Sequence, residues 1–355
     1  MEFTTGGQLE VRLTPDDVGK RVSVRRLTGD SAPGARFADA VGVLTSWDDG
    51  VLSITRRSGE TVRVDASSLV AAKVVPAAPA RRRGPAANFP ELARVMARAW
   101  EPVESESMGG WTLRAAVQEV PREARPGGAV VGRRVGFTRR ANSVLPLGDP
   151  GLPLDEALSY VRKWYEDRGL PPYVQVSTGA EGTQEVLGAE LAGRGWESEV
   201  SAEVRIGALA PVGDLETGGA DVRLARSADA AWMSRYQRSE VPGAHVVKVL
   251  ESGPSVWFAT VPGEDGGRPA AIGRCVVDGR WAGFAAVEVD PAHRRRGLAT
   301  AVMAVLARRA LDEGASAAWL QVEDGNTGAR GLYDGMGFTV HHRYHHYRSA
   351  QTQSA

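Results

Sequence analysis

The stretch from Val287 to Thr300 constrains the fold of this chain more than any other part of the sequence. An apolar strand ends there, a loop with three arginines follows, and a glycine opens an apolar helix. Amide groups in the first turn of a helix lack partners within the helix, and the helix dipole adds partial positive charge. Small residues also let a ligand approach the backbone closely. We therefore expect a strand–loop–helix unit that binds a pyrophosphate.

A second motif follows the first. It comprises residues 320–326 (Leu-Gln-Val-Glu-Asp-Gly-Asn), Ala329 and residues 332–338 (Leu-Tyr-Asp-Gly-Met-Gly-Phe). Together the two segments resemble the GNAT superfamily of N-acetyltransferases, whose patterns are Gln/Arg-x-x-Gly-x-Gly/Ala and Asn-x-x-Ala-x-x-Leu-Tyr-x-x-x-Gly-Phe. The first pattern is filled here by Arg294, Gly297 and Ala299. The resemblance covers about residues 220–348 and implies a GNAT fold for that part.

The resemblance also implies acetyl-CoA as cosubstrate. Its pantetheine arm would lie between two splayed parallel strands, and its pyrophosphate would lie on the arginine loop and the start of the following helix. The implied binding set is Val287, Glu288, Val289, Arg294, Arg295, Arg296, Gly297, Leu298, Ala299, Thr300, Asn326 and Tyr333. Two simpler roles stay open: Asn326 as the N-cap of a helix, and Tyr333 as a core side chain.

The implied reaction is direct attack of an amine on the thioester. Tyr333 would protonate the leaving thiolate, because a phenol carries one proton with a pKa near 10. The Val289 amide would hold the oxyanion. Glu288 is the candidate base, although an ion pair with an arginine is an equally simple role for it. Some family members carry a glutamate where this chain has Gln321, so a water relay is a further alternative.

The chain divides by pattern into an α+β arrangement of three folded parts, with a linker and a tail. Short alternating strands at 22–24, 51–55 and 61–64 predict a small SH3-like β-barrel over residues 1–75. Proline, glycine and arginine mark 76–87 as a linker. A repeated strand–helix–strand–helix–strand order predicts tandem GNAT-like units at 88–213 and 214–348, followed by a tail at 349–355. The alternative is one large α/β domain.

The first unit lacks the phosphate loop. Its corresponding turn, at residues 147–154, contains prolines that remove amide donors and an aspartate that repels phosphate, so this unit should not bind CoA. The run from Thr138 to Ser143 presents guanidinium and amide groups suited to a carboxylate-bearing substrate. The candidate substrate residues are Arg139, Arg140, Asn142 and Ser143. A structural ion-pair and interdomain role is the alternative.

Composition excludes several function classes. The chain of 355 residues has 43 Lys+Arg against 43 Asp+Glu, which does not predict a nucleic-acid partner. Without a signal peptide or an apolar run of about 20 residues, we expect a cytoplasmic protein without a membrane partner. A single cysteine, Cys275, excludes a cysteine-rich metal site and is expected to pack in a strand. The histidines of residues 341–346 are expected on a solvated strand, with no metal.

The layout resembles a group of actinobacterial two-domain acetyltransferases, some associated with N-acetylglutamate synthesis and others with protein or histone-like acetylation. The expected function is transfer of acetyl from acetyl-CoA to a small primary amine, for example an amino acid such as glutamate. One alternative is a protein lysine or N-terminal acetyltransferase that uses the barrel for docking. Another is an acyl-CoA-sensing protein without turnover.

Overall fold

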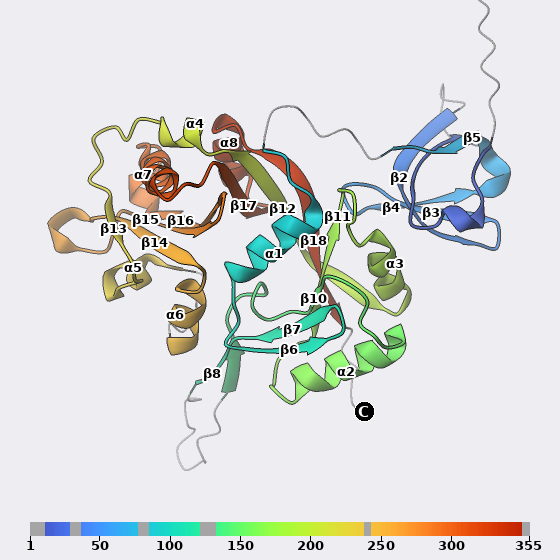
Figure 1. Cartoon of the computed structure of the whole chain (residues 1–355), viewed down its shortest axis with the longest axis horizontal. Coiled ribbons are helices and arrows are strands. Elements are labelled where there is room, and N and C mark those ends of the chain that lie inside the picture. The colour runs from blue at the N-terminus through green and yellow to red at the C-terminus, as the bar shows by residue number, and fades with distance from the viewer. Residues whose placement is uncertain (1–10, 29–36, 77–84, 121–132, 238–242, 350–355) are drawn as a thin grey trace, which may run out of the picture.

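The computed structural model describes residues 11–28, 37–76, 85–120, 133–237 and 243–349. A small β-domain lies beside a larger α/β body (Figure 1). Most of the predicted linker and tail, including Arg81, Arg82 and Arg83, falls outside the described residues. None of the helices in the described ranges is long and apolar enough to cross a membrane.

The small domain is one antiparallel sheet in the order β4-β3-β2-β1-β5. Its strands are β1 (Arg21–Leu27), β2 (Phe37–Asp48), β3 (Val51–Thr55), β4 (Thr61–Asp65) and β5 (Leu69–Val74). Asp49 and Gly50 both have positive φ at the β2–β3 turn, as a tight type I′ hairpin requires. A small N-terminal β-domain is confirmed. No ladder joins edge strands β4 and β5 in the described residues, so the predicted barrel is not closed.

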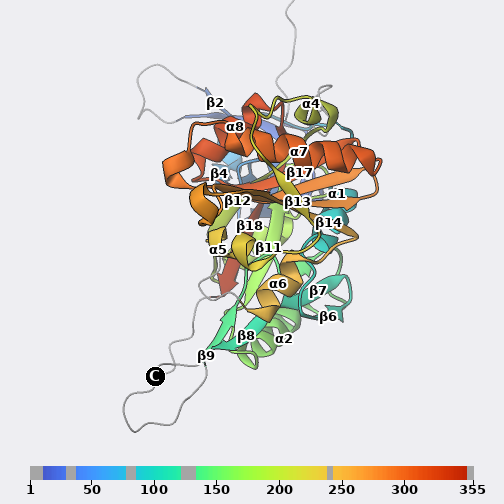
Figure 2. The same ribbon diagram turned by 90° about the vertical axis from the view of Figure 1, so that its left-hand side faces the viewer.

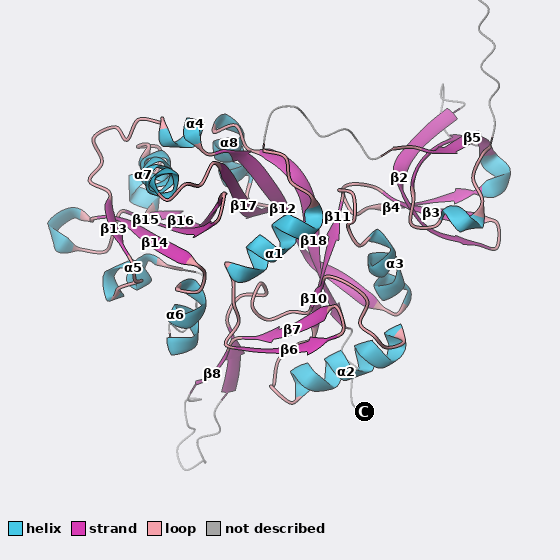
Figure 3. Ribbon diagram, viewed as in Figure 1, coloured by secondary structure: helices cyan, strands magenta, loops and turns pink. Residues whose placement is uncertain are grey.

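The body consists of helices and strands in two successive halves. The first half contains α1 (Phe89–Arg98), β6 (Glu104–Met108), β7 (Trp111–Ala115), β8 (Val117–Val120), β9 (Arg133–Gly136), β10 (Leu145–Pro146), α2 (Leu154–Glu166), β11 (Tyr173–Thr178), α3 (Glu185–Gly193), β12 (Trp196–Ala208) and α4 (Ala210–Gly213). The second half contains β13 (Arg223–Ala225), α5 (Ala230–Arg235), α6 (Ala244–Leu250), β14 (Ser255–Val261), β15 (Ala271–Asp278), β16 (Trp281–Val289), α7 (Leu298–Asp312), β17 (Ala317–Glu323), α8 (Thr327–Gly335) and β18 (Thr339–Ser349). Figure 3 distinguishes these helices (cyan) from the strands (magenta).

Both halves contribute to one eight-stranded sheet, in the order β11-β18-β12-β17-β16-β15-β14-β13. Each half ends strand–helix–strand: β11-α3-β12 in the first and β17-α8-β18 in the second. The two final strands are exchanged, because β12 lies between β17 and β18 while β18 lies between β11 and β12. The halves are therefore joined by continuous backbone pairing. The tandem-unit boundaries stay a prediction.

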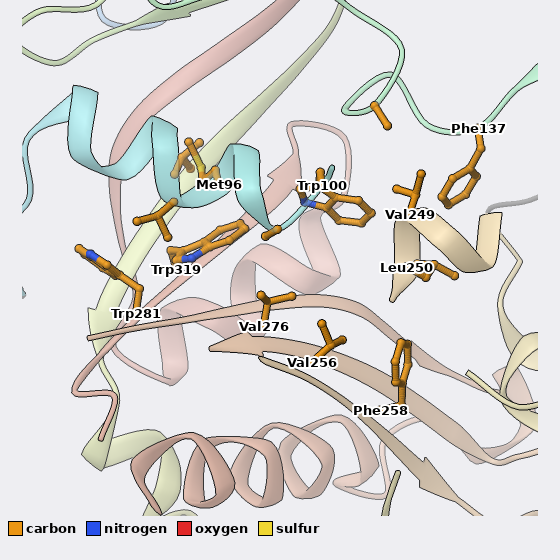
Figure 4. Packing of buried hydrophobic residues seen from close by; sticks show 14 of the residues in the cluster. Met96, Trp100, Phe137, Val249, Leu250, Val256, Phe258, Val276, Trp281 and Trp319 are labelled. Carbon is orange, nitrogen blue, oxygen red and sulfur yellow. The ribbon is translucent and has the colours of Figure 1, made fainter. Parts of the chain in front are cut away.

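Helices cover both faces of this sheet (Figure 2). One apolar core lies between the sheet and the helices α7 and α8. On the opposite face, α1, α5 and α6 enclose a second core that contains four tryptophans, and Figure 4 labels Trp100, Trp281 and Trp319. This core contains Trp100, Trp232, Trp281 and Trp319. Asn88 caps the N-terminus of helix α1, because its side-chain oxygen accepts a hydrogen bond from the Glu91 amide at 2.8 Å.

The histidines of β18 contradict the prediction of a solvated strand. His342, His345 and His346 are buried, with 0%, 5% and 2% of their surfaces exposed. Burial follows from the central position of β18 between β11 and β12, which no local pattern reveals. The small domain also contacts this strand, because the Arg57 guanidinium donates to the carbonyls of Val340 and His341 at 2.8 and 2.9 Å.

Candidate active site

The strands β16 and β17 pair only over their first residues. Their parallel ladder runs from Trp281 opposite Ala317 to Phe284 opposite Leu320, although β16 continues to Val289. The register of β16 on β15 shifts at this point, and Ala286 adopts φ +52°. A bulge of this kind bends a strand and ends pairing. The opening lies where the sequence resemblance implies a pantetheine arm.

The Val289 amide, which is predicted to hold the oxyanion, is directed away from β15. The neighbouring Asp290 amide donates toward β15, to Ala270 at 2.8 Å. Since successive amides along a strand point in opposite directions, the Val289 amide is directed toward the β17 side. The side chains of Val287 and Val289 pack with the core beneath α7.

Asp290 shapes the loop that follows β16. Its carboxylate accepts the Ala292 amide at 2.8 Å and forms an ion pair with Arg235. These contacts, led by the backbone hydrogen bond, hold the pKa of Asp290 below its usual value. Nδ1 of His293 lies 3.6 Å from Oδ1 of Asp290. Asp290 is thus engaged by its own neighbours.

The arginines of the loop form no ion pair with a carboxylate of the described residues. Arg294, Arg295 and Arg296 are all exposed, and no carboxylate of the described residues forms an ion pair with them. Arg295 adopts φ +63° and Gly297 adopts φ +76°. Three uncompensated guanidinium groups beside a left-handed turn suit a polyanionic ligand.

The first turn of α7 supplies amide donors. Gly297 is its N-cap residue and contributes no capping side chain, while its carbonyl accepts the Ala301 amide at 3.0 Å. By helix geometry the amides of Leu298, Ala299 and Thr300 lack partners within the helix. No atom lies within 4 Å of a Cβ built on Gly297, so the positive φ is what calls for glycine there.

Tyr333 lies on α8, and Asn326 is the residue that precedes this helix. Tyr333 is 8% exposed, and its ring meets Phe338 edge-on at 5.9 Å within the core shared with α7. Asn326 caps the helix, because its side-chain oxygen accepts the Ala329 amide at 3.1 Å. The capping role of Asn326 is therefore present, and its side chain remains exposed at the surface.

Glu288 and Gln321 lie on the sheet face opposite α7. Val287, Val289, Leu320 and Val322 face α7, so strand alternation turns the two polar side chains toward α1 and α5. The Glu288 carboxylate accepts the Gln237 amide at 3.1 Å. The Gln321 amide lies 3.6 Å from the sulfur of Met96. Glu288 and Gln321 therefore lie on the same face of the sheet, on the two strands that separate, β16 and β17.

A small hollow of about 10 Å³, which we call the arginine hollow, lies between α1 and the sheet beside Gln321. Its polar lining comprises Arg114, Arg140, Gln175, Ser177 and Gln321, without any carboxylate. Arg114 is 4% exposed; its Nε donates to Ser143 O at 2.9 Å, and its Nη2 donates to Ser143 Oγ and Gln175 Oε1. Burial lowers the pKa of Arg114 to about 10. This uncompensated charge favours an anionic ligand group.

Sequence reasoning missed Arg114 and Gln175. Arg114 comes from β7 and Gln175 from β11, and only folding brings them beside Gln321 of β17. A weak signal exists, because Val-Gln-Val at 174–176 matches Leu-Gln-Val at 320–322 in the corresponding strand of the other half. Arg140, which was predicted, does line the hollow and lies 5.4 Å over the ring of Trp100.

The other predicted substrate residues bond to the protein itself. Arg139 forms an ion pair with Glu199 at 2.8 Å. Asn142 is buried, accepts the Ala116 amide at 2.9 Å and donates to Phe137 O at 2.6 Å, so its side chain secures backbone. Ser143 is also fully buried and holds Arg114. Of these three side chains, Ser143 is the one that contacts a lining residue of the arginine hollow.

The corresponding opening in the first half is filled by a side chain. Val144, which directly precedes β10, forms an isolated parallel bridge with Val174 of β11, and no ladder continues it between β10 and β11. Gln184 spans the gap, donating to Pro146 O and accepting the Ser177 amide at 2.7 Å. A glutamine thus occupies the position between strands that remains open in the second half.

Cys275 is fully buried, and burial raises the pKa of its thiol to about 12. A thiol of that pKa is protonated at neutral pH and is a poor nucleophile. In the described ranges no group of three or more His, Cys, Asp or Glu side chains is placed to hold a metal ion.

Two family models match this chain. The model described as "Probable histone acetyltransferase Rv0428c C-terminal" matches residues 86–347, and "Rv0428c N-terminal Sm-like domain" matches residues 16–73. The second match gives the small β-domain a description as Sm-like. Comparison with curated proteins gives no match.

Solved structures similar to this chain include several acetyltransferases. The GCN5-related N-acetyltransferase from Kribbella flavida is 16% identical, with 76% of this chain and 98% of that chain covered at a TM-score of 0.50. A tandem GNAT protein from the clavulanic acid biosynthesis pathway is 14% identical, with coverage of 77% and 99% and a TM-score of 0.48. The first of these likenesses shows that the chain has the GNAT fold.

Proposed function

The chain belongs to the family described as "Probable histone acetyltransferase Rv0428c C-terminal" and is an acyltransferase enzyme, and from this premise we propose that it transfers acetyl from acetyl-CoA directly to a primary amine of a small molecule. The observation that carries the proposal is the cradle at the start of α7. It combines unpaired first-turn amides with Arg294, Arg295 and Arg296 beside the opened strands β16 and β17.

In this proposal the α7 amides and the arginine loop bind the pyrophosphate, while Asn326 contacts the CoA. The backbone of Val287, Glu288 and Val289 would hold the pantetheine arm. The nitrogen of the acceptor forms a bond to the thioester carbon, the Val289 amide stabilises the oxyanion, and the C–S bond then breaks. Tyr333 gives its proton to the sulfur, and Glu288 or a water held near Gln321 takes the proton from the amine.

We further propose that the acceptor carries a carboxylate, as an amino acid such as glutamate does. The arginine hollow supports this choice, because Arg114 and Arg140 line it without any acid and it adjoins Gln321. Nη1 of Arg114 is left available after Nε and Nη2 bond to Ser143 and Gln175. A carboxylate oxygen replacing one water there would receive charge-assisted hydrogen bonds.

An acceptor screen with acetyl-CoA, detecting release of free thiol, tests these proposals. We expect release with glutamate and a KM for glutamate that rises at least tenfold in Arg140→Gln, with the KM for acetyl-CoA unchanged. Arg139→Gln is the matched control, since Arg139 pairs with Glu199. Tight CoA binding with no release for any amine would instead support an acyl-CoA sensor.

A protein acceptor is the second candidate, because the family description names a histone acetyltransferase. The Sm-like domain would then act as a docking module, held on β18 by Arg57. Thiol release only with lysine-containing or N-terminal peptides would favour this candidate over glutamate. For either acceptor, we also propose the cytoplasmic location that the sequence predicts.

A further inference from the structure

A second and larger cavity lies in the first half of the body, away from the opened strands. It has a volume of about 470 Å³, within the range of small-molecule sites. Its walls come from α1, from the 147–154 turn and from the start of α3. Most of the lining side chains are apolar: Phe89, Trp111, Leu147, Leu152, Leu154 and Leu187. We call it the first-half cavity.

This cavity is not a second acyl-CoA groove. Gln184, which lines it, closes the gap between β10 and β11 through its bonds to Pro146 and Ser177. The turn that would have to hold phosphates carries Pro150 and Pro153, which lack amide hydrogens, and Asp149. The space left in front of Gln184 is therefore a pocket of different chemistry.

Charge at its rim suggests the ligand. Arg94 is exposed on α1, and its guanidinium bonds only to Pro90 O of its own helix, at 3.4 Å, among the described residues. Asp149 lies on the turn and accepts the Gly151 amide at 2.7 Å. Trp111 Nε1 and Gly148 O satisfy each other at 3.0 Å. Arg94 is thus the lining cation that is available to a ligand.

We propose that the first-half cavity binds a small monoanion with an apolar body, of the medium-chain carboxylate class, independently of acetyl-CoA. The apolar walls cover the body of the ligand, and Arg94 pairs with its carboxylate at the rim. A single negative charge meets less repulsion from Asp149 than a phosphate would. Because Phe89 lines both this cavity and the arginine hollow, the occupant would lie against the same helix as the proposed acceptor.

Isothermal titration of the full chain with octanoate tests this proposal, with 1-octanol and octylamine as probes of the charge. We expect octanoate to bind one per chain and more tightly than either probe. Arg94→Gln should weaken octanoate binding about fivefold, equivalent to about 1 kcal/mol. Arg98→Gln is the matched control, because Arg98 lies on the same helix outside the cavity and pairs with Asp278.

Leu187→Trp provides a second test by filling the cavity, and it should abolish octanoate binding while the chain keeps its melting temperature and its acetyl-transfer rate. Octanoate affinity unchanged by Arg94→Gln, or octanoate displaced by saturating acetyl-CoA, would overturn the proposal. Absence of octanoate binding would overturn it as well. Failure of acetyl transfer alone leaves the titration unaffected, so the two proposals fail separately.

Discussion

Tyr333 combines an observed packing position with the proposed role of general acid. Its ring belongs to the core between α7 and α8, where Phe338 meets it at 5.9 Å. Replacement by phenylalanine keeps that ring and removes only the hydroxyl. The consequences for stability and for turnover can therefore be separated at this position.

For Tyr333→Phe we expect kcat to fall about 100-fold, because general acid catalysis contributes at least that much, while the KM for acetyl-CoA stays within about twofold. Steady-state thiol release measures both constants. Tyr344→Phe is the control, since Tyr344 is also buried but lies on β18 and packs in the opposite core. Full turnover in Tyr333→Phe would remove the tyrosine from the mechanism.

Residue identity alone does not distinguish side chains that could bind a ligand from side chains that bond to the protein itself. Asn142 and Ser143 have the right chemistry for a carboxylate, yet they are buried and bond to Phe137, Ala116 and Arg114. The sequence does not distinguish Arg114 as a candidate, because a single arginine in a strand is common. Its burial without an acid exists only in the folded chain.

At the scale of elements, the start of α7 depends on its glycine. Gly297→Ala should raise the KM for acetyl-CoA severalfold and lower the free energy of unfolding by about 1 kcal/mol, because alanine disfavours φ +76°. Urea denaturation and initial-rate kinetics measure the two effects. Gly193→Ala in α3, where φ is ordinary and no atom lies within 4 Å, should be neutral or slightly stabilising. Equal behaviour of the two variants would contradict this.

The strand β18 should make stability depend on pH. Burial lowers the pKa of His345 from 6.5 to about 4, and it also lowers those of His342 and His346. The unfolded chain therefore binds more protons below pH 6.5, and stability present above that pH is lost as pH falls toward 4. Between pH 7.5 and 5.5, His345 alone should lower the free energy of unfolding by about 1 kcal/mol.

Urea titrations at both pH values check this expectation. His345→Gln should reduce the pH-dependent loss, because glutamine can still bond Thr178 or Ser201, the two partners of the imidazole, without titrating. His293→Gln is a suitable control, since His293 lies on the arginine loop. A loss of stability that is the same in wild type and His345→Gln would show that other groups dominate.

At the scale of the whole molecule, the exchange of β12 and β18 makes the two halves interdependent. The chain 214–355 alone would leave β17 and β18 without the strand that pairs with both, exposing two long edges. We expect this fragment to be insoluble, and we expect co-expression with 1–213 to restore a soluble complex. Gel filtration and circular dichroism measure this outcome. A folded, monomeric 214–355 fragment would show that the exchange is dispensable.

The sequence by itself determined the features that are local along the chain. The strand–loop–helix of residues 287–300 and the cap at Asn326 are set by neighbours within a few residues, so glycine, arginine and apolar spacing were sufficient to predict them. The prolines and the aspartate of the 147–154 turn are equally local, and from them we still predict that this turn binds no phosphate.

Only the tertiary structure decided which distant segments meet. Exchange of β12 and β18, burial of the β18 histidines and the closure of the first opening by Gln184 all depend on pairings across many residues. The arginine hollow likewise needs Arg114, Gln175 and Gln321 from three strands. Strand order follows from the packing of the whole sheet, and alternation along a single strand carries no information about which strand lies beside it.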